Sequence, residues 1–386
     1  MKKKKILFLE ARYDSFYGAQ KSMLTLIQSL DRNRFHPKVV TTANGELREN
    51  YDKHNVPVDI IKLGKKANVF GGKLLEYSFF NKILVVLQVL LFNVKVFRYI
   101  KKNKIDIVYV NDLRALFYVA LASKISRKKI VWYIRSDVND SKATFLGFKF
   151  ADKIVTIAHG VLRNIEQSKL QPYENKFTNI YTGFDFEQFK IIDKSVAKNQ
   201  LGIESDKFVI GYLGSINNRK GIDLLVDAYL ELVDEHSNIE LMIVGSVSAG
   251  HETYWEEQKS KLEGYPFTYI PFTDKVSEAY SALDVFVLPS KSEGLPRVLI
   301  EAMAHKVPVI STDVGGVREI IVTDNHGLIV HDHANKKNMV CSLKKVVTKP
   351  NFRKEIVENG FYHVTFTFSK RQFREKINKL FETILD

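Results

Sequence analysis

The most specific stretch of the sequence is SEGLPRVLIEAMA, residues 292–304. It follows the apolar run Val285–Leu288, which its pattern predicts to be a buried strand. A strand, a tight turn with Gly and Pro, and then a helix leave free backbone N–H groups at the start of the helix. Such groups favour an anion such as a diphosphate. Pro296 suits the first turn, because its missing N–H costs nothing there.

Two acidic residues flank this predicted anion site. Glu293 lies in the turn, and Glu301 lies about 7.5 Å along the helix from Pro296. Carboxylates do not bind phosphate, but they accept hydrogen bonds from hydroxyl groups. A ligand with sugars on both sides of a diphosphate would therefore satisfy both. For the carboxylates alone, a helix-dipole partner at Glu293 and an exposed charge at Glu301 are the favoured alternative.

A second strand–loop–helix element is YLGSINNRKGIDLL, residues 212–225. Arg219 and Lys220, at its loop-to-helix junction, can neutralise a leaving pyrophosphate, and a surface pair of basic residues is the alternative. Both elements are expected at the carboxyl ends of strands in one domain, where open α/β sheets bind ligands. Gly315 and Gly316 form another such turn, which we expect to be conformational rather than catalytic.

Short runs rich in Val, Ile and Phe alternate with helical patterns along all 386 residues, which predicts βα units and parallel sheets in two domains. The pattern restarts after a polar stretch at 193–199. The expected strands are Lys5–Leu9, Pro37–Thr41, Val58–Lys62, Ile105–Val110, Ile130–Ile134, Lys153–Ile157, Phe177–Tyr181, Phe208–Tyr212, Glu240–Val244, Phe267–Pro271, Val285–Leu288, Pro308–Ser311 and Gly327–Val330.

The net charge of +14 is unevenly distributed. Residues 1–190 hold 34 Lys and Arg against 17 Asp and Glu, whereas the remainder holds 24 against 27. A basic half points to a polyanion, either an anionic membrane surface or nucleic acid, and a solvated surface is the alternative. Nucleic acid is the less favoured partner, because no helix-turn-helix, RRM or zinc pattern is present.

The densest apolar segment is 77–102. Asn81, Gln88, Lys95 and Lys102 recur every seventh residue and predict one narrow polar stripe on an otherwise apolar helix. Charged residues interrupt the segment, so we do not expect it to span a bilayer. The favoured interpretation is a largely buried helix. The alternative is docking at a membrane interface through apolar side chains and nearby cations, namely Phe79, Phe80, Lys65, Lys66, Lys73, Lys82, Arg98, Lys101, Lys102 and Lys104.

A single cysteine, Cys341, excludes an internal disulfide and fits a reducing cytoplasm, and we expect it to pack in a core. The basic start of the chain is followed by an apolar run that stops at Glu10, which is too short for a signal peptide.

Together these segments resemble the family 4 glycosyltransferases of the GT-B fold. The resemblance rests on GYLGSINNRKGIDLLVDAY, SEGLPRVLIEAMA and PVISTDVGGVREI, in which Glu293 and Glu301 match the family's E-x7-E motif. Weaker matches are TGFDFEQF at 182–189, YGAQKSM at 17–23, and the closing helix FTFSKRQFREKINKLFETIL. The resemblance implies two doubly wound Rossmann-like domains that face each other across a cleft. Residues 1–190 would bind the acceptor and 191–365 the nucleotide sugar, and the helix within 366–386 would cross back.

The resemblance also assigns roles to single residues. Glu301 would hold the ribose hydroxyls, Glu293 the donor sugar and Lys220 the diphosphate. It implies the catalytic residues Glu293, Lys220 and Arg219, and the donor-binding residues Glu301, Gly294, Leu295, Pro296, Gly214, Ser215, Gly18 and Gly245. No metal and no cofactor is required, because Lys220 and helix dipoles would stabilise the leaving group.

Three positions depart from the family pattern. Ser215 stands where an arginine is frequent, so Arg219 would take over that phosphate contact. Arg135 replaces a frequent histidine, and the first-domain loop has Tyr17, Gly18 and Ala19 in place of two glycines. The candidates for the acceptor side of the cleft are Arg135, Asp112 and His159, of which Asp112 could equally be a helix N-cap and His159 a helix-start or packing residue.

The expected function is transfer of a hexose, with retained anomeric configuration, from a nucleotide diphosphate sugar such as a UDP-sugar. The expected acceptor is a glycan or glycolipid hydroxyl, in cell-surface polysaccharide or lipopolysaccharide-type synthesis on the inner face of the cell membrane. A soluble acceptor is the first alternative. A nucleic-acid-binding protein is the alternative from another class, and an epimerase or phosphorylase on the same plan also fits the second domain.

Overall fold

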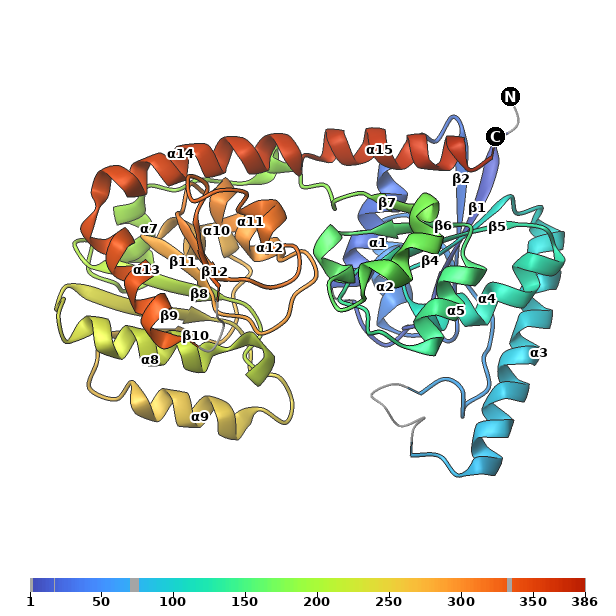
Figure 1. The fold of residues 1–386 in the computed structure, drawn as a ribbon, viewed down its shortest axis with the longest axis horizontal. Coiled ribbons are helices and arrows are strands. Elements are labelled where there is room, and N and C mark those ends of the chain that lie inside the picture. Colours follow the sequence, from blue (N-terminus) through green and yellow to red (C-terminus); the bar gives the residue numbers. More distant parts are fainter. Residues whose placement is uncertain (1–2, 17, 70–75, 332–334, 386) are drawn as a thin grey trace. The chain divides into compact units, whose positions relative to one another are not determined.

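The computed structural model describes residues 3–16, 18–69, 76–331 and 335–385. Two of the residues named above, Tyr17 and Lys73, lie outside them. The chain forms two compact units (Figure 1). Unit 1 comprises 1–157, 161–183 and 373–386, and unit 2 comprises 158–160 and 184–372. The chain thus changes unit at 183–184, a few residues before the boundary expected at 190.

Unit 1 is built on a seven-stranded parallel sheet in the order β3-β2-β1-β4-β5-β6-β7. Its strands are β1 (Lys4–Glu10), β2 (Phe35–Thr41), β3 (Val58–Ile60), β4 (Ile107–Val110), β5 (Lys129–Ile134), β6 (Lys153–Thr156) and β7 (Phe177–Asn179). Its helices include α1 (Gly18–Ser29), α2 (Glu46–Lys53), α3 (Phe79–Asn103), α4 (Leu113–Ile125), α5 (Lys142–Phe150), α6 (Gln167–Leu170), the 3-10 helix η2 (Gln171–Lys176) and most of α15 (Lys370–Thr383).

Unit 2 repeats the plan with six parallel strands in the order β10-β9-β8-β11-β12-β13. These are β8 (Phe208–Leu213), β9 (Ile239–Val244), β10 (Phe267–Ile270), β11 (Val285–Leu288), β12 (Val309–Thr312) and β13 (Leu328–Val330). The helices are α7 (Lys194–Gln200), α8 (Ile222–Val233), α9 (Glu252–Lys261), α10 (Val276–Ser281), α11 (Arg297–Ala304), α12 (Val317–Ile320), α13 (Lys336–Thr348) and α14 (Pro350–Thr367), with the 3-10 turns η3 (Phe186–Gln188) and η4 (Asn218–Lys220).

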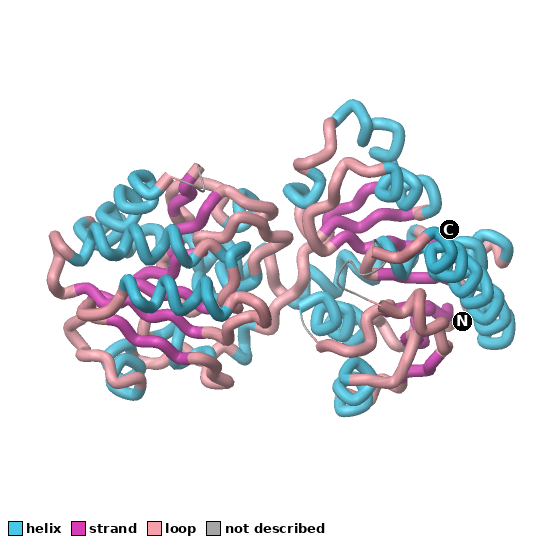
Figure 2. The backbone as a smooth tube through the Cα atoms, turned by 90° about the horizontal axis from the view of Figure 1, so that it is seen from below, coloured by secondary structure: helices cyan, strands magenta, loops and turns pink. Residues whose placement is uncertain are grey.

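Each sheet lies between helices, as Figure 2 shows for both units. This explains the continuous apolar runs of the central strands: every residue of β4, β11 and β12 is buried, because helices cover both faces. In unit 1, α15 completes the core by packing Phe381 against Phe8 and Phe35. All thirteen strands expected from the sequence are present, with ends shifted by a few residues at most.

The order of the strands reverses direction at one point in each sheet. In unit 1, β1 pairs with both β2 and β4, and in unit 2, β8 pairs with both β9 and β11. Loops from adjacent strands diverge at such a switch point, so the carboxyl ends of the two strands border a crevice that suits a ligand. Both candidate regions considered below lie at these two points.

The favoured interpretation of α3 is wrong, because the helix is not largely buried. Its buried side chains are Phe92, Asn93, Val96 and Ile100, all in its second half. The N-terminal half extends past the neighbouring α4 (Figure 1). Within the described part of the chain, α3 is the one helix whose length and apolar composition would allow it to cross a membrane.

The expected environment of Cys341 is also wrong. The residue lies on α13, whose buried side chains are Met339, Val340, Leu343 and Val346. Cys341 points away from that row and is exposed. A residue two positions from Met339 falls on the opposite side of a helix of 3.6 residues per turn, which explains the result.

Candidate functional site

The switch point of unit 2 brings the two sequence elements together. The loop after β8 leads into η4 and then α8, and the loop after β11 leads into α11. Gly221 joins η4 to α8 with φ +65°, and a Cβ there would lie 2.1 Å from the carbonyl oxygen of Pro289. Glycine is therefore required twice over, for its left-handed backbone and for the close approach of the two loops.

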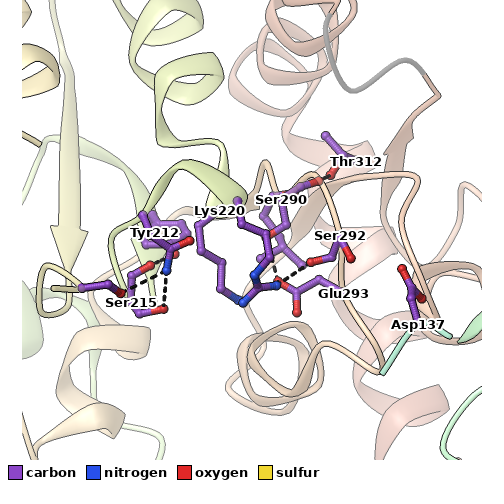
Figure 3. A network of polar contacts seen from close by, with 12 residues as sticks. Asp137, Tyr212, Ser215, Lys220, Ser290, Ser292, Glu293 and Thr312 are labelled. Atoms are coloured by element: carbon purple, nitrogen blue, oxygen red, sulfur yellow. Dashed lines mark hydrogen bonds and ion pairs between the residues drawn. The ribbon is translucent and has the colours of Figure 1, made fainter. Parts of the chain in front are cut away.

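The centre of the site is an ion pair between these loops (Figure 3). Lys220 Nζ donates to Glu293 Oε1 over 2.6 Å, and Ser290 Oγ donates to the same oxygen over 2.8 Å. The side chains of Lys220 and Glu293 are 14% and 11% exposed. A charge pair this well shielded from water is much stronger than one on an open surface.

Arg219 lies beside this pair in a more open position. Its Nη1 donates to the carbonyl of Ser292 over 2.6 Å and lies 3.8 Å from Glu293 Oε1. Its side chain is half exposed. The next lysine, Lys291, bonds back to Asn218 Oδ1 over 2.6 Å and ties the two loops together from the other side. The loops thus carry three cations, of which Lys220 and Arg219 lie within 4 Å of the Glu293 carboxylate.

Glu301 lies on α11, in a separate environment. Its Oε2 accepts from the hydroxyl of Tyr280 over 3.2 Å, and its Oε1 lies 3.6 Å from Nη2 of Arg297. Burial, and then the charge of Glu301, raises the pKa of Tyr280 well above its ordinary value, so the phenol remains a donor. Glu301 is about a quarter exposed and is therefore accessible to a ligand.

The turn between the acids is held from behind. The carbonyl of Gly294 accepts from the N–H of Gly316 over 2.6 Å, and Gly315 has φ +50°, with its Cβ position 2.0 Å from the carbonyl of Glu293. The glycine pair is thus conformational, as expected. Pro296 occupies the N-cap position of α11, and no side chain caps that helix. Proline has no side-chain acceptor to offer to the N–H groups of the first turn.

Gly214, Ser215 and Gly245 follow the carboxyl ends of β8 and β9, next to the switch point of unit 2. A Cβ on Gly245 would lie 1.8 Å from the carbonyl of Gly214, so this glycine lets two strand ends approach. Ser215 is exposed in the same loop, and its carbonyl accepts from the hydroxyl of Tyr212 over 2.8 Å. Leu295 is buried, so this position can contribute to a ligand site only through its backbone.

The switch point of unit 1 holds a second polar group. A cavity of about 300 Å³ is lined by Glu10, Ala11, Arg12, Ala19, Gln20, Asn111, Asp112 and Arg114. Glu10 is buried, and its two oxygens accept from the N–H of Arg12 and from Asn111 Nδ2, each over 3.1 Å. Burial, and then the nearby Asp112, raises the pKa of Glu10 to about 7.

Three residues expected on the acceptor side have different surroundings. Asp112 is the N-cap of α4, where its Oδ1 accepts from the N–H of Ala115 over 2.8 Å, and burial raises its pKa. Arg135 donates from Nε to Asn111 Oδ1 over 2.9 Å, so Asn111 links it to Glu10. His159 begins the 3-10 helix η1 (His159–Leu162) and is exposed, which fits a helix start and not a packing position.

Gly18 begins α1 at the same end of unit 1, and a Cβ there would meet nothing within 4 Å. Packing therefore does not explain this glycine. Four residues with prominent contacts were missed in the sequence: Ser290, Tyr280, Glu10 and Asn111. The available signal was position, because Ser290, Glu10 and Asn111 all stand at or just beyond the carboxyl end of a strand next to a switch point.

Two family models match the chain in succession. Residues 16–188 match the model described as Glycosyltransferase Family 4, and residues 193–363 match the model described as Glycosyl transferases group 1. The chain belongs to the family 4 glycosyltransferases. The two family models together match both halves of the chain. This glycosyltransferase acts on nucleotide sugars.

The relatives of this glycosyltransferase agree with that assignment. It is 25% identical to the capsular polysaccharide biosynthesis glycosyltransferase CapM of Staphylococcus aureus over 355 residues, which cover 88% of this chain and 91% of CapM. The structure of Anabaena HepE in complex with UDP has a TM-score of 0.81 at 20% identity, with 98% and 100% of the chains covered. The apo lipopolysaccharide outer core galactosyltransferase WaaB has a TM-score of 0.76 at 16% identity, with 98% and 99% covered. The GT-B architecture is confirmed.

Proposed function

We propose that this glycosyltransferase moves a hexose from a UDP-sugar to a hydroxyl of a lipid-carried glycan, with retention of configuration and without a metal ion. One observation supports the proposal most: the shielded Lys220–Glu293 pair lies beside the uncapped start of α11 at the unit 2 switch point. The structure of HepE with UDP supports the choice of base. CapM and WaaB act in capsule and lipopolysaccharide synthesis, and this supports the class of acceptor.

In this proposal the donor binds along the crevice between the β8 and β11 loops. The diphosphate takes the first-turn N–H groups of α11 and the ammonium of Lys220. Glu293 then exchanges part of its bond with Lys220 for hydroxyls of the donor sugar, and Glu301 takes the ribose hydroxyls. Arg219, half exposed and next to Glu293, supplies further positive charge.

The chemistry follows from where charge develops. The bond between the anomeric carbon and the phosphate oxygen breaks, the acceptor oxygen attaches on the same face, and its proton passes to the departing phosphate. Negative charge grows on that phosphate, so the prearranged Lys220 and the α11 dipole lower the barrier. For the described residues, no cluster of three or more His, Cys, Asp or Glu has the arrangement of a metal site. The proposal routes no step through a metal, because Lys220 and the α11 dipole would offset the charge of the leaving group, and EDTA should leave the rate unchanged.

For the acceptor we propose the unit 1 cavity, in which Glu10, Asn111 and Asp112 offer hydrogen-bonding groups to a sugar. The basic charge of residues 1–190 supports a membrane-borne acceptor on the cytoplasmic face, because anionic lipid attracts such a surface.

A thermal-shift panel of UDP-, GDP- and ADP-sugars tests the donor assignment, because a ligand of the folded state raises the melting temperature. We expect a shift with UDP-sugars that Glu301→Gln reduces. No shift with any nucleotide sugar, or an unchanged shift in the variant, would contradict the proposal. The anomeric configuration of the product, read by NMR, tests retention separately.

A further inference from the structure

Helix α3 turns its polar side toward the protein. Asn81 Oδ1 accepts from Lys66 Nζ over 2.6 Å, and Gln88 Oε1 accepts from the N–H of Ala67 over 3.0 Å. One heptad further on, Lys95 Nζ donates to the carbonyl of Lys62 over 2.9 Å. The polar stripe seen in the sequence is thus bonded to the segment 62–67. An ordinary surface helix does the reverse and buries its apolar side.

The opposite side of α3 is apolar and exposed. Phe80 is 80% exposed and Leu91 is 64% exposed. The exposed apolar side chains are Phe79, Phe80, Ile83, Leu84, Val86, Leu87, Leu90, Leu91 and Val94. They extend over 79–94, which is about 22 Å at 1.5 Å per residue. A contiguous apolar strip of this kind on a folded surface marks an interaction site.

The same side becomes cationic at the C-terminal end of the helix. Positions 87, 91, 94, 98 and 101 follow one another at spacings of three and four, so they lie in one row. The first three are Leu87, Leu91 and Val94, and the last two are Arg98 and Lys101, which are exposed. Helix α3 carries five Lys or Arg and no Asp or Glu. An apolar row that ends in cations is complementary to an anionic bilayer, which offers apolar chains beneath negative headgroups.

We propose that α3 docks unit 1 on an anionic lipid bilayer through this side. The strip 79–94 enters the boundary between headgroups and acyl chains, while Arg98 and Lys101 contact the headgroups. The inference identifies the docking element for the membrane part of the proposed function. It needs neither the donor nor the transfer reaction, so the two can be tested apart.

Two features favour docking on a bilayer surface over contact with a second copy of the chain and over a full membrane span. A second copy of the chain would bring two helices of charge +5 together without a single acidic partner on either, and like charges repel. A full span would carry the polar bonds of Asn81 and Gln88, and the backbone of 62–67, into hydrocarbon, where unsatisfied polar groups are costly. Contact by one side avoids both penalties.

Flotation of the full chain with vesicles tests the proposal. The chain should bind phosphatidylcholine vesicles that contain phosphatidylglycerol, and bind pure phosphatidylcholine weakly. Leu87→Glu/Leu91→Glu should lower binding at least about tenfold, because two charges would enter the apolar boundary. The matched control is Tyr362→Glu/Phe366→Glu, which changes two even more exposed apolar side chains on α14 in unit 2 and should bind like the parent.

The cationic end has its own test. Arg98→Glu/Lys101→Glu should remove the preference for phosphatidylglycerol, by roughly tenfold or more, since each headgroup-facing cation contributes about 1 kcal/mol. Lys337→Glu/Lys354→Glu makes the same change of charge at exposed positions of unit 2 and should keep the preference. In a third variant, Phe80→Trp, fluorescence should shift to the blue on vesicle binding, whereas that of Phe366→Trp should not.

Three results would overturn the proposal. One is no binding of the parent to either vesicle. Another is unchanged binding of Leu87→Glu/Leu91→Glu. The third is a parent dimer that this variant dissociates in solution, which would make a second copy the occupant. A UDP-sugar thermal shift measured on the same samples shows whether the donor site is intact, so failure of docking is distinguishable from failure of the proposed function.

Discussion

The two switch points occupy the same place in two similar sheets, yet the carboxylate at each one accepts hydrogen bonds from different kinds of donor. In unit 2, Glu293 accepts from the ammonium of Lys220, with Arg219 nearby. In unit 1, Glu10 accepts from neutral N–H groups of Arg12 and Asn111, and its pKa rises to about 7. The comparison shows that the two sheets share a strand order, whereas the donors beside the acid differ: a lysine ammonium at Glu293 and neutral N–H groups at Glu10.

Removal of the Lys220 ammonium from unit 2 should have the largest effect on the rate of transfer. Lys220→Ala takes away the charge that opposes the leaving diphosphate and removes the ammonium that donates to Glu293. We expect the rate of transfer from a UDP-sugar to fall by about 10²–10³-fold. Lys261→Ala, which removes a lysine paired with Asp227 on the surface, is the control and should keep the rate. Equal rates for Lys220→Ala and Lys261→Ala would contradict a role of the Lys220–Glu293 pair in the transfer reaction.

Glu301 separates binding of the donor from chemistry at the same switch point. Glu301→Gln keeps the shape and a hydrogen-bonding oxygen, but loses the charge that strengthens bonds to hydroxyls. UDP affinity, measured by calorimetry, should fall roughly tenfold, which is about 1.4 kcal/mol. Glu257→Gln on α9, an exposed acid in the same unit, should bind UDP like the parent. If Glu301→Gln binds UDP as tightly as the parent, the proposed contact between Glu301 and the ribose is wrong.

Gly221 tests whether the crevice depends on close approach of the loops. Gly221→Ala adds a Cβ at φ +65° and 2.1 Å from a carbonyl oxygen, whereas Gly202→Ala adds one at φ +75° with nothing within 4 Å. The second variant carries only the backbone cost of about 1 kcal/mol, and the first carries a clash as well. The melting temperature of Gly221→Ala should therefore fall by at least about 4 °C more than that of Gly202→Ala. Equal losses would show that the loops have room to separate.

A substitution at Glu10 should have the smallest effect, and it tests how the surroundings in unit 1 act on this carboxylate. Its folded-state pKa is raised, so the folded chain binds more protons than the unfolded chain between the ordinary value and about 7. Stability from this group is therefore present at low pH and lost as pH rises through that window. Glu10→Gln should gain a few degrees in melting temperature over the parent near pH 8, and little or nothing near pH 5.

Asp284 provides a contrast of opposite sign. Burial works to raise its pKa, but bonds from Lys194 and Lys198 outweigh burial and lower it. Asp284→Asn should therefore cost stability at neutral pH, and the difference from the parent should shrink as pH falls below the ordinary range of an aspartate. A gain at high pH for Asp284→Asn, or none for Glu10→Gln, would contradict the contrast between an acid bonded to lysines and an acid bonded to neutral donors.

Much of the architecture could be predicted from local pattern. The thirteen strands follow from short apolar runs, since parallel strands covered on both faces must be continuously apolar. The proximity of Glu293 and Lys220 was also predictable, because both residues follow strand ends in one domain. The side of α3 that faces solvent was not, since a helix with one polar stripe can direct that stripe to water or to a partner. The bonds from Asn81, Gln88 and Lys95 to 62–67 decide for the partner.

The sequence by itself determined the doubly wound class, the family and the placement of Glu293 and Lys220 after strand ends, because period, turn chemistry and motif spacing are local properties of the chain. Only the tertiary structure decided that Glu10 is buried beside Asn111, 101 residues away, and that the apolar side of α3 is exposed. The physical reason is that pKa and exposure depend on what long-range packing places around a side chain. Neighbours in the sequence do not specify those surroundings.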